Sequence, residues 1–302
     1  MSTVKILKKD HLGWESCVEV SNGLVDFIAT TAVGPRIIRF GFTCDKNEFC
    51  EFKDQIGKSG GDKWNSYGGH RLWHSPEAMP RSYFPDNFPV DWHEIENGIS
   101  LSQPVESTTG IKKDIDISLA TDKPMVTVVH KLTNQSMWPL ELAVWGISVM
   151  AAGGKAIIPQ PLRQTGLLSN RLVALWPYTK MNDNRVYWGD KYITVTQDAQ
   201  AKIPFKLGMP NEDGWAAYYN DGHLFVKKYT HSMDGTYPDL GCSWETYTNN
   251  LMLEMESLSP LKVLKPGETA SHKETWYLLD NVDCPKTEDD MDKIKEKVLS
   301  LF

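Results

Sequence analysis

Apolar residues alternate with polar ones along almost the whole chain, and this period of two restricts what the chain can fold into. Successive side chains of a β-strand point to opposite faces, so alternation predicts strands with one buried and one wetter face. Asp114 and Asp116, for example, alternate with Ile115 and Ile117. Strand-like segments of this kind lie at 17–30, 33–42, 98–106, 112–121, 125–134, 190–198, 223–231, 250–260 and 270–279. The chain is therefore expected to consist mainly of β-strands.

Turn-forming residues separate these segments. Asn22-Gly23 divides residues 17–30 into two short runs, and both turn positions tolerate a positive φ, so a hairpin is predicted there. The longer apolar run at 140–154 would by periodicity alone also allow a buried helix. Its β-branched and aromatic residues, and the predicted strands before it, favour a strand.

A single helix is predicted, at residues 286–302. Thr287 and Asp290 have the spacing of a capping box, in which each side chain bonds to the other residue's backbone. The apolar residues that follow recur at helical spacing and would share one face: Met291, Ile294, Val298 and Leu301. We expect this helix to pack on a sheet.

No linker-like segment, composition shift or fixed-period repeat divides the 302 residues. So many strands do not form one flat sheet, because large twisted sheets curl or split into packed layers. We therefore predict an all-β fold: a single domain over residues 1–302, built as a large antiparallel β-sandwich with a short C-terminal helix.

Charge and cysteine content restrict the partners and the compartment. The formal net charge is −7, and Lys and Arg are scattered, which argues against nucleic-acid binding. The start of the chain has no apolar run of signal-peptide length, and no run is long enough to span a membrane. Five cysteines without a CxxC pair are typical of free thiols in a reducing cytosol. We expect a cytoplasmic protein without a membrane partner; its oligomeric state stays open.

The segment Tyr67–Glu77, YGGHRLWHSPE, concentrates reactive side chains. Its glycine pair predicts a sharp turn or a close backbone approach, and Pro76 argues against a full helix. Since histidine changes protonation near neutral pH, His70 and His74 could perform acid–base chemistry or bind a ligand. Two alternatives stay open. One is a metal site formed by these histidines and Glu77, and the other is a structural loop.

Glu254 and Glu256 form a second group of candidates. They are two residues apart in an alternating strand, so their carboxyl groups lie on one face. Repulsion between them raises at least one pKa unless a cation intervenes, which suits an acid or a base; a solvated outer face is the alternative. Residues 235–248 before this strand are expected to form a loop. Its aromatic and acidic residues could contact a sugar, or belong to a plain loop: Tyr237, Asp239, Trp244, Glu245 and Tyr247.

Four segments, in their order along the chain, resemble the galactose mutarotase-like superfamily, which includes aldose 1-epimerases. They are VGPRIIRFGF at 33–42, the Gly-Gly-His segment, LTNQSMWPLELAVWGIS at 132–148, and LMLEMESLSPLKVLKPGETASHKETWYLL at 251–279. The last is the most specific, because the superfamily has a late strand with a Leu-Glu pair, a Pro-Gly segment and a strand like HKETWYLL. The resemblance implies a supersandwich of two large antiparallel sheets, with the ligand cleft across one concave face.

The resemblance also implies an aldose 1-epimerase-like enzyme that interconverts the anomers of a free or modified small sugar. Mutarotation needs a base for the anomeric hydroxyl and an acid for the ring oxygen, and no cofactor or metal. Glu254 matches the superfamily's base, and His70 or His74 matches an early sugar-contacting histidine. The expected sugar-binding residues are Arg36, Arg71, Trp73, Tyr237, Asp239 and Glu256.

One departure from the superfamily's pattern bears on the chemistry. There, a second histidine, the acid, lies in the strand after the Thr-Asn turn, whereas residues 142–150 of this chain, LAVWGISVM, contain none. Either His70 or His74 protonates the ring oxygen, or the chain binds carbohydrate without catalysis. A lyase that acts on a uronate sugar is a third possibility, with Tyr67, Tyr237 or a histidine removing the proton.

Overall fold

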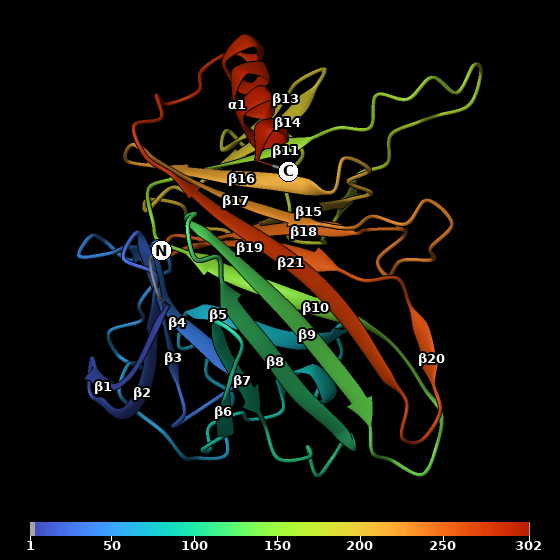
Figure 1. Cartoon of the computed structure of the whole chain (residues 1–302). Coiled ribbons are helices and arrows are strands. Elements are labelled where there is room, and N and C mark those ends of the chain that lie inside the picture. The colour runs from blue at the N-terminus through green and yellow to red at the C-terminus, as the bar shows by residue number, and fades with distance from the viewer. Residues whose placement is uncertain (1–3, 302) are drawn as a thin grey trace.

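The computed structural model describes residues 4–301, which form two large antiparallel sheets and one C-terminal helix (Figure 1). The first sheet runs, in spatial order, through β1 (Lys5–His11), β2 (Trp14–Ser21), β3 (Val25–Thr30), β4 (Arg36–Phe42), β5 (Gly69–Ser75), β10 (Leu140–Met150), β19 (Leu253–Leu258), β18 (Trp244–Thr248), β15 (Phe205–Met209) and β12 (Ala174–Leu175), and β20 (Lys262–Leu264) pairs with β10.

The second sheet runs through β13 (Val186–Trp188), β14 (Tyr192–Thr196), β11 (Lys155–Pro159), β16 (Trp215–Asn220), β17 (His223–Tyr229), β21 (Thr269–Leu279), β9 (Met125–Asn134), β8 (Ile111–Leu119), β7 (Gly98–Ser102) and β6 (Asp91–Ile95). A short 3-10 helix, η1 (Arg81–Tyr83), follows β5, and α1 (Glu288–Ser300) ends the described chain. The predicted all-β sandwich with a C-terminal helix is therefore confirmed.

Local sequence patterns explain individual strands. The predicted hairpin around Asn22-Gly23 joins β2 to β3, and Gly23 has the positive φ that this turn requires. Along β8 buried residues alternate strictly with half-buried ones, so Asp114 and Asp116 lie on its wetter face as predicted. The long apolar run at 140–150 is the strand β10, nearly all of it buried.

The main hydrophobic core lies between the two sheets. Phe40 on β4 of the first sheet packs edge-on or tilted against Phe225 on β17 and Trp276 on β21 of the second sheet, with ring centroids 5.8–5.9 Å apart. Aromatic pairs in such geometry add to the stabilisation that burial of their area provides. The two sheets are thus held together by interdigitating side chains, which gives the first sheet a rigid backing.

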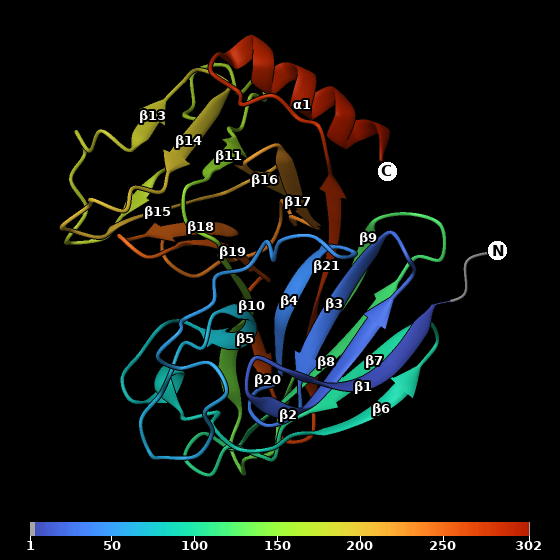
Figure 2. The same cartoon turned by 90° about the vertical axis from the view of Figure 1, so that its left-hand side faces the viewer.

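Helix α1 packs on the outer face of the second sheet, beside β11, β14 and β16 (Figures 1 and 2). Thr287 and Asp290 form the predicted capping box. The apolar stripe of the helix is buried as predicted, through Met291, Ile294 and Val298. The helix therefore covers sheet surface on the side of the molecule opposite to the first sheet.

The segment around residue 70, for which a structural loop is one of the alternatives from the sequence, is the strand β5, between β4 and β10. Gly68, directly before β5, and Gly69, its first residue, both have positive φ. A Cβ at Gly69 would lie 2.2 Å from the carbonyl oxygen of Ile37, and one at Gly68 would lie 2.0 Å from that of Cys50. The glycine pair thus serves the close backbone approach that its sequence predicts.

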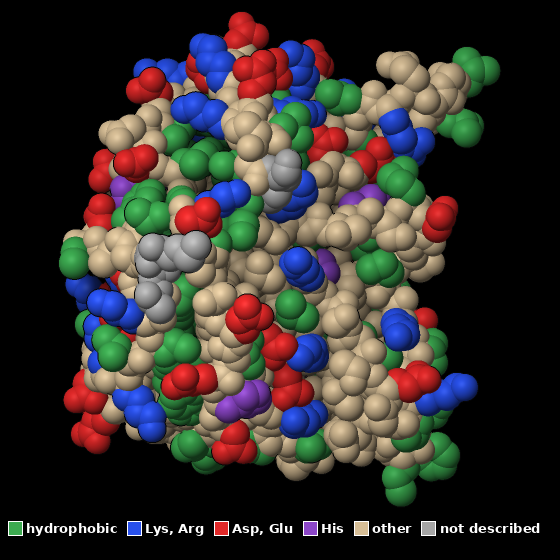
Figure 3. All heavy atoms as spheres, in the orientation of Figure 1, with side chains coloured by type: hydrophobic (Ala, Val, Ile, Leu, Met, Phe, Trp, Pro, Cys, Tyr) green, Lys and Arg blue, Asp and Glu red, His purple; other side chains and the backbone are tan. Residues whose placement is uncertain are grey.

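The surface carries mixed charge. On the face displayed in Figure 3, acidic and basic side chains are interspersed. Among the described residues no helix has the length and apolar character needed to cross a bilayer.

Candidate functional site

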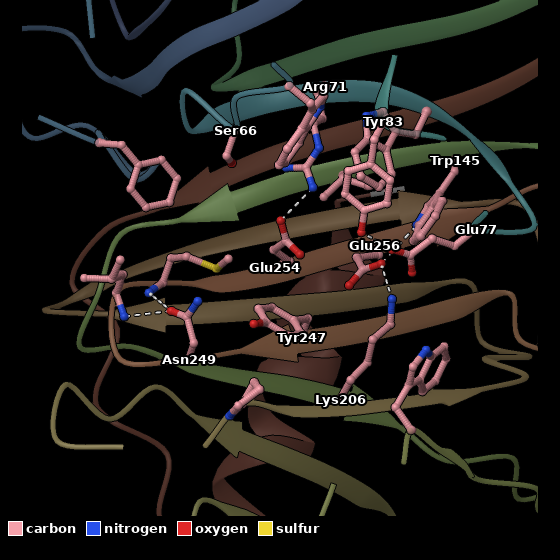
Figure 4. Close-up of a pocket in the computed structure, with 18 of the residues that line it drawn as sticks. Ser66, Arg71, Glu77, Tyr83, Trp145, Lys206, Tyr247, Asn249, Glu254 and Glu256 are labelled. Carbon is pink, nitrogen blue, oxygen red and sulfur yellow. Dashed lines mark hydrogen bonds and ion pairs between the residues drawn. The ribbon is translucent and has the colours of Figure 1, made fainter. Parts of the chain in front are cut away.

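A pocket of about 540 Å³ opens on the face of the first sheet that points away from the second sheet. Its floor comes from the consecutive strands β5, β10, β19, β18 and β15 (Figure 4). Aromatic side chains form much of its wall: Trp64, Trp73, Tyr83, Trp145, Trp176, Tyr178 and Tyr247. Charged side chains of both signs also line it: Asp54, Arg71, Glu77, Lys206, Glu254 and Glu256.

Strand register brings these residues together. In the ladder between β19 and β18, Glu254 lies opposite Tyr247 and Glu256 opposite Glu245. On the other side of β19, Glu256 lies opposite Ile147 of β10, which in turn lies opposite Arg71 of β5. Because paired residues share a face of the sheet, side chains more than 180 positions apart meet over one floor.

Two cations flank the paired glutamates (Figure 4). Arg71 Nη2 donates to Glu254 Oε1 at 2.8 Å, and Lys206 Nζ donates to Glu256 Oε2 at 3.1 Å. Lys206 Nζ also lies 2.7 Å from Glu245 Oε2. Trp145 Nε1 donates to Glu256 Oε2 at 3.0 Å. These bonds fix both carboxyl groups on the floor of the pocket.

Each cation also lies over two tryptophan rings. The Arg71 guanidinium carbon lies 5.4 Å from the ring centroid of Trp64 and 4.7 Å from that of Trp73. Lys206 Nζ lies 4.9 Å from the centroid of Trp145 and 4.6 Å from that of Trp176. A cation over an aromatic face is attracted by the negative ring face, so the tryptophans hold both cations in place.

Burial changes the proton affinity of these groups. It raises the pKa of Glu256 to about 7, against the opposing effect of the Lys206 charge. It also raises the pKa of Glu245. Burial alone would lower the pKa of Lys206, but the carboxylates of Glu245 and Glu256 raise it well above its ordinary value. One ammonium group cannot neutralise two buried carboxylates, so repulsion between the carboxylates favours uptake of a proton by this cluster.

Several buried polar atoms around the pocket have no hydrogen-bond partner among residues 4–301. They are donors on Trp64 (Nε1) and Arg71 (Nε and Nη1), the hydroxyl of Ser66, and Oε1 of Glu256. Buried polar groups are normally bonded, and leaving them unpaired is costly. A ligand that both donates and accepts hydrogen bonds would satisfy this set.

Four of the residues predicted from the sequence converge on this pocket: Arg71, Trp73, Glu254 and Glu256. Arg36 does not; it is fully buried and its Nη2 donates to Asp86 at 2.8 Å. Tyr237 borders a separate hollow, where its ring stacks on His231 at 5.0 Å. Asp239 lies in the loop before β18 and is also absent from the pocket's described lining.

His70 and His74 do not line the pocket, which corrects the expectation that one of them faces Glu254. Their strand alternates: Arg71 and Trp73 point into the pocket, and His70, Leu72 and His74 point toward the second sheet. His74 instead borders a smaller cavity of about 300 Å³, with its Nε2 3.7 Å from Glu106. Burial lowers the pKa of both histidines.

His70 belongs to a polar cluster between the sheets, which we call the interlayer cluster: His70, Ser148 and Ser257 of the first sheet, with His130, Lys227, His272 and Glu274 of the second. His70 Nε2 lies 2.6 Å from His130 Nε2, and Lys227 Nζ lies 3.1 Å from Glu274 Oε1. Glu274 also accepts bonds from Ser257 and Trp276. The polar groups of the interlayer cluster thus find their partners within the cluster and its surroundings, without a ligand.

Among the described residues, His70, His130 and Glu274 form a group that could hold a metal ion, with ligand atoms within 4.8 Å of one another. The Lys227 ammonium already neutralises Glu274, and it would repel a second cation beside it. The metal set considered from the sequence, His70, His74 and Glu77, does not converge. Glu77 lines the pocket and accepts a bond from Tyr83, while the histidines lie on the opposite face of β5.

Sequence reasoning missed Lys206 and Trp176 of the pocket, and it named Tyr247 as a possible sugar contact but placed it in a loop. The segment expected as a loop at 235–248 ends in the strand β18, where Tyr247 faces the pocket two residues after Glu245. Period-two alternation in WETYT could have indicated this strand. Lys206 on β15 and Trp176 after β12 come from short strands in turn-rich segments, and no local pattern links them to β19.

No protein-family model matches the chain. No curated protein matches it significantly either. Several solved structures are similar in fold. A galactose mutarotase-like protein from Clostridium acetobutylicum is 11% identical with a TM-score of 0.55, over 92% of this chain and 99% of that one. A galactose mutarotase-like protein from Lactobacillus casei is 10% identical with a TM-score of 0.53, over 87% of this chain and all of that one.

A TPR-domain containing protein from Parabacteroides distasonis is 13% identical with a TM-score of 0.59, and the match spans 90% of this chain but 49% of that one. At such identities the likeness extends to the fold alone. It agrees with the resemblance inferred from the sequence and with the two-sheet architecture described above. The chain therefore has a galactose mutarotase-like fold.

Proposed function

We propose that the pocket binds a small sugar and interconverts its anomers by acid–base catalysis, as an aldose 1-epimerase does. The observation that carries this proposal is the pair of carboxyl groups on β19. Both lie on the floor of an aromatic pocket, yet they have different partners: Arg71 for Glu254, and Lys206 with Trp145 for Glu256. Environments that separate two carboxyl groups in this way suit a base and an acid.

In the proposed reaction Glu254, the base, takes the proton of the anomeric hydroxyl. The electrons of that O–H bond form the carbonyl, and the bond between the anomeric carbon and the ring oxygen breaks. Glu256, protonated part of the time because burial raises its pKa to about 7, gives its proton to the ring oxygen. Rotation of the open chain and reversal of these steps close the ring on the other face of the carbonyl.

The unpaired polar atoms support a sugar as ligand. A hydroxyl group both donates and accepts, so sugar hydroxyls can bond to the unpaired nitrogens of Arg71 as well as to Oε1 of Glu256. The aromatic walls suit the apolar C–H faces of a pyranose ring. The names of the structural neighbours, galactose mutarotase-like proteins, point to the same class of ligand.

A sugar-binding protein without catalysis is the second candidate. It is favoured by the ion pair between Arg71 and Glu254, since a carboxylate paired at 2.8 Å must exchange that partner to accept a proton. It is also favoured by the lack of a histidine in the pocket's described lining. The sequence-based alternative of a uronate lyase loses its proposed bases, because Tyr67, Tyr237 and both histidines lie outside the pocket.

Polarimetry on freshly dissolved single anomers of glucose, galactose, mannose and xylose tests the proposal, with protein-free buffer as the reference. We expect acceleration for at least one sugar and a loss of about 100-fold or more in Glu254→Gln, the usual worth of a positioned acid or base. Binding of that sugar by calorimetry should persist in the variant. Binding without acceleration in the parent protein would replace the enzyme with the second candidate.

A further inference from the structure

The pocket has two ends, and the glutamates lie midway between them. Going across the first sheet, β5 and β10 lie on one side of β19, and β18 and β15 lie on the other. Arg71 on β5 and Lys206 on β15 both reach inward to the glutamates, as Figure 4 shows. Both cations bond to a central glutamate and lie near tryptophan rings: Arg71 near Trp64 and Trp73 at the β5 end, and Lys206 near Trp176 and near Trp145, which comes from β10.

The separation of the two ends exceeds the width of one sugar ring. Neighbouring strands lie about 4.8 Å apart, so the four steps from β5 to β15 span about 19 Å of floor. A single pyranose ring placed over Glu254 and Glu256 would contact only the middle of this floor. A ring at the centre leaves the remaining wall residues, and their unpaired atoms, without a ligand.

The end at β5 carries most of the unpaired polar atoms. Trp64 Nε1, Ser66 Oγ and two nitrogens of Arg71 are buried there without a hydrogen-bond partner in the described chain. Trp64 and Tyr83, both half-buried, pack edge-on against the buried Trp73 with centroids 5.2 and 5.0 Å away. Aromatic surface beside donors is the composition that a second sugar ring needs, because its C–H face stacks and its hydroxyls accept.

Given the sugar-binding function proposed above, we infer that the natural ligand has at least two rings, as in a reducing disaccharide. The reducing ring lies over Glu254 and Glu256, where its anomeric carbon meets the base and the acid. The second ring lies at the β5 end against Trp64 and Tyr83, with its hydroxyls bonded to Arg71, Ser66 and Trp64. The pocket volume of about 540 Å³ is within the range of sites that enclose ligands larger than one ring.

Calorimetric titration of matched pairs tests this inference: glucose against maltose and cellobiose, and galactose against lactose. We expect at least one disaccharide to bind about tenfold more tightly than the monosaccharide. Trp64→Ala should weaken that disaccharide roughly three- to tenfold, the worth of one aromatic contact, and change monosaccharide affinity less than twofold. Trp138→Ala is the control, because Trp138 is 71% exposed and lies outside the pocket. If Trp64→Ala does not fold, Trp64→Phe replaces the indole with a smaller aromatic ring and removes Nε1, and it should weaken the disaccharide while changing monosaccharide affinity less than twofold.

Each outcome separates this inference from the proposed function. If the monosaccharides bind at least as tightly as every disaccharide, the inference of a second sugar ring is wrong, and the proposed function stays intact. A Trp64→Ala variant that loses monosaccharide and disaccharide affinity equally would overturn the placement of that ring. If no sugar of either length binds to the parent protein, the proposed function fails and the two-ring ligand fails with it.

Discussion

The pocket and the interlayer cluster lie on opposite faces of the same strands, and both contain a buried lysine beside glutamate. Lys206 meets Glu245 and Glu256 in the pocket, and Lys227 meets Glu274 between the sheets. The difference is in how completely the groups are paired. Glu274 accepts bonds from Ser257 and Trp276 besides its lysine, whereas Glu256 and Arg71 keep unpaired atoms next to a cavity.

This difference shows which buried ionisable groups are available for chemistry. The interlayer histidines have lowered pKa values because of burial, and the pKa of His272 falls to about 3. A search for functional residues by perturbed pKa alone would therefore have pointed to His70 on the inner face of β5, which does not line the pocket. The pocket face differs from the interlayer cluster in having unpaired polar atoms beside a cavity, where a ligand can complete the hydrogen bonding.

Removal of the interlayer lysine should produce the largest effect. Lys227→Met leaves the fully buried Glu274 without a cation, which typically costs about 3–5 kcal/mol of unfolding free energy. Urea unfolding followed by tryptophan fluorescence measures this loss. The matched variant is Lys206→Met, where the loss should be smaller because Glu256, whose pKa burial already raises, can take up a proton instead. Equal losses in both variants would contradict the contrast between the two clusters.

A smaller effect, confined to activity, is expected from Glu256→Gln. If Glu256 is the acid, the parent's kcat/KM is highest while Glu256 is protonated and falls as pH rises through its pKa of about 7. The variant cannot donate this proton, so its rate should be about 100-fold lower, and the decline near pH 7 should disappear. Polarimetric rates between pH 5 and 9 measure both changes. A variant that keeps the decline would assign the acid to another group.

The fold could be predicted because alternation and turn signals are local. The hairpin at Asn22-Gly23, the strand β8 and the capped helix α1 each follow from a few neighbouring residues. The same alternation placed Glu254 and Glu256 on one face. Both faces of β5 are buried, however, and both carry polar side chains, so alternation does not show whether Arg71 or the two histidines meet the cavity.

The rest of the site depends on contacts that no local pattern contains. Lys206 reaches Glu256 only because β15, β18 and β19 are consecutive in the sheet. Arg71 and its neighbour His70 point to opposite faces of β5. Which of them reaches the pocket depends on which face of β5 packs on the second sheet, and a shift of one residue would exchange them. Tyr237 and Asp239 follow from their chemical type alone, and neither lines the pocket.

The smallest expected effect concerns His74, and it tests the corrected orientation of β5 most directly. His74 is three residues from Arg71 and points toward the second sheet, so His74→Gln should change kcat and KM for sugar less than twofold. Stability should change by about 1 kcal/mol or less, because Glu106 keeps its bonds from Lys113 and Thr109. Arg71→Gln is the matched control: it lies on the pocket face and should weaken sugar binding or turnover. A large loss of turnover in His74→Gln with unchanged stability would return the acid's role to this histidine.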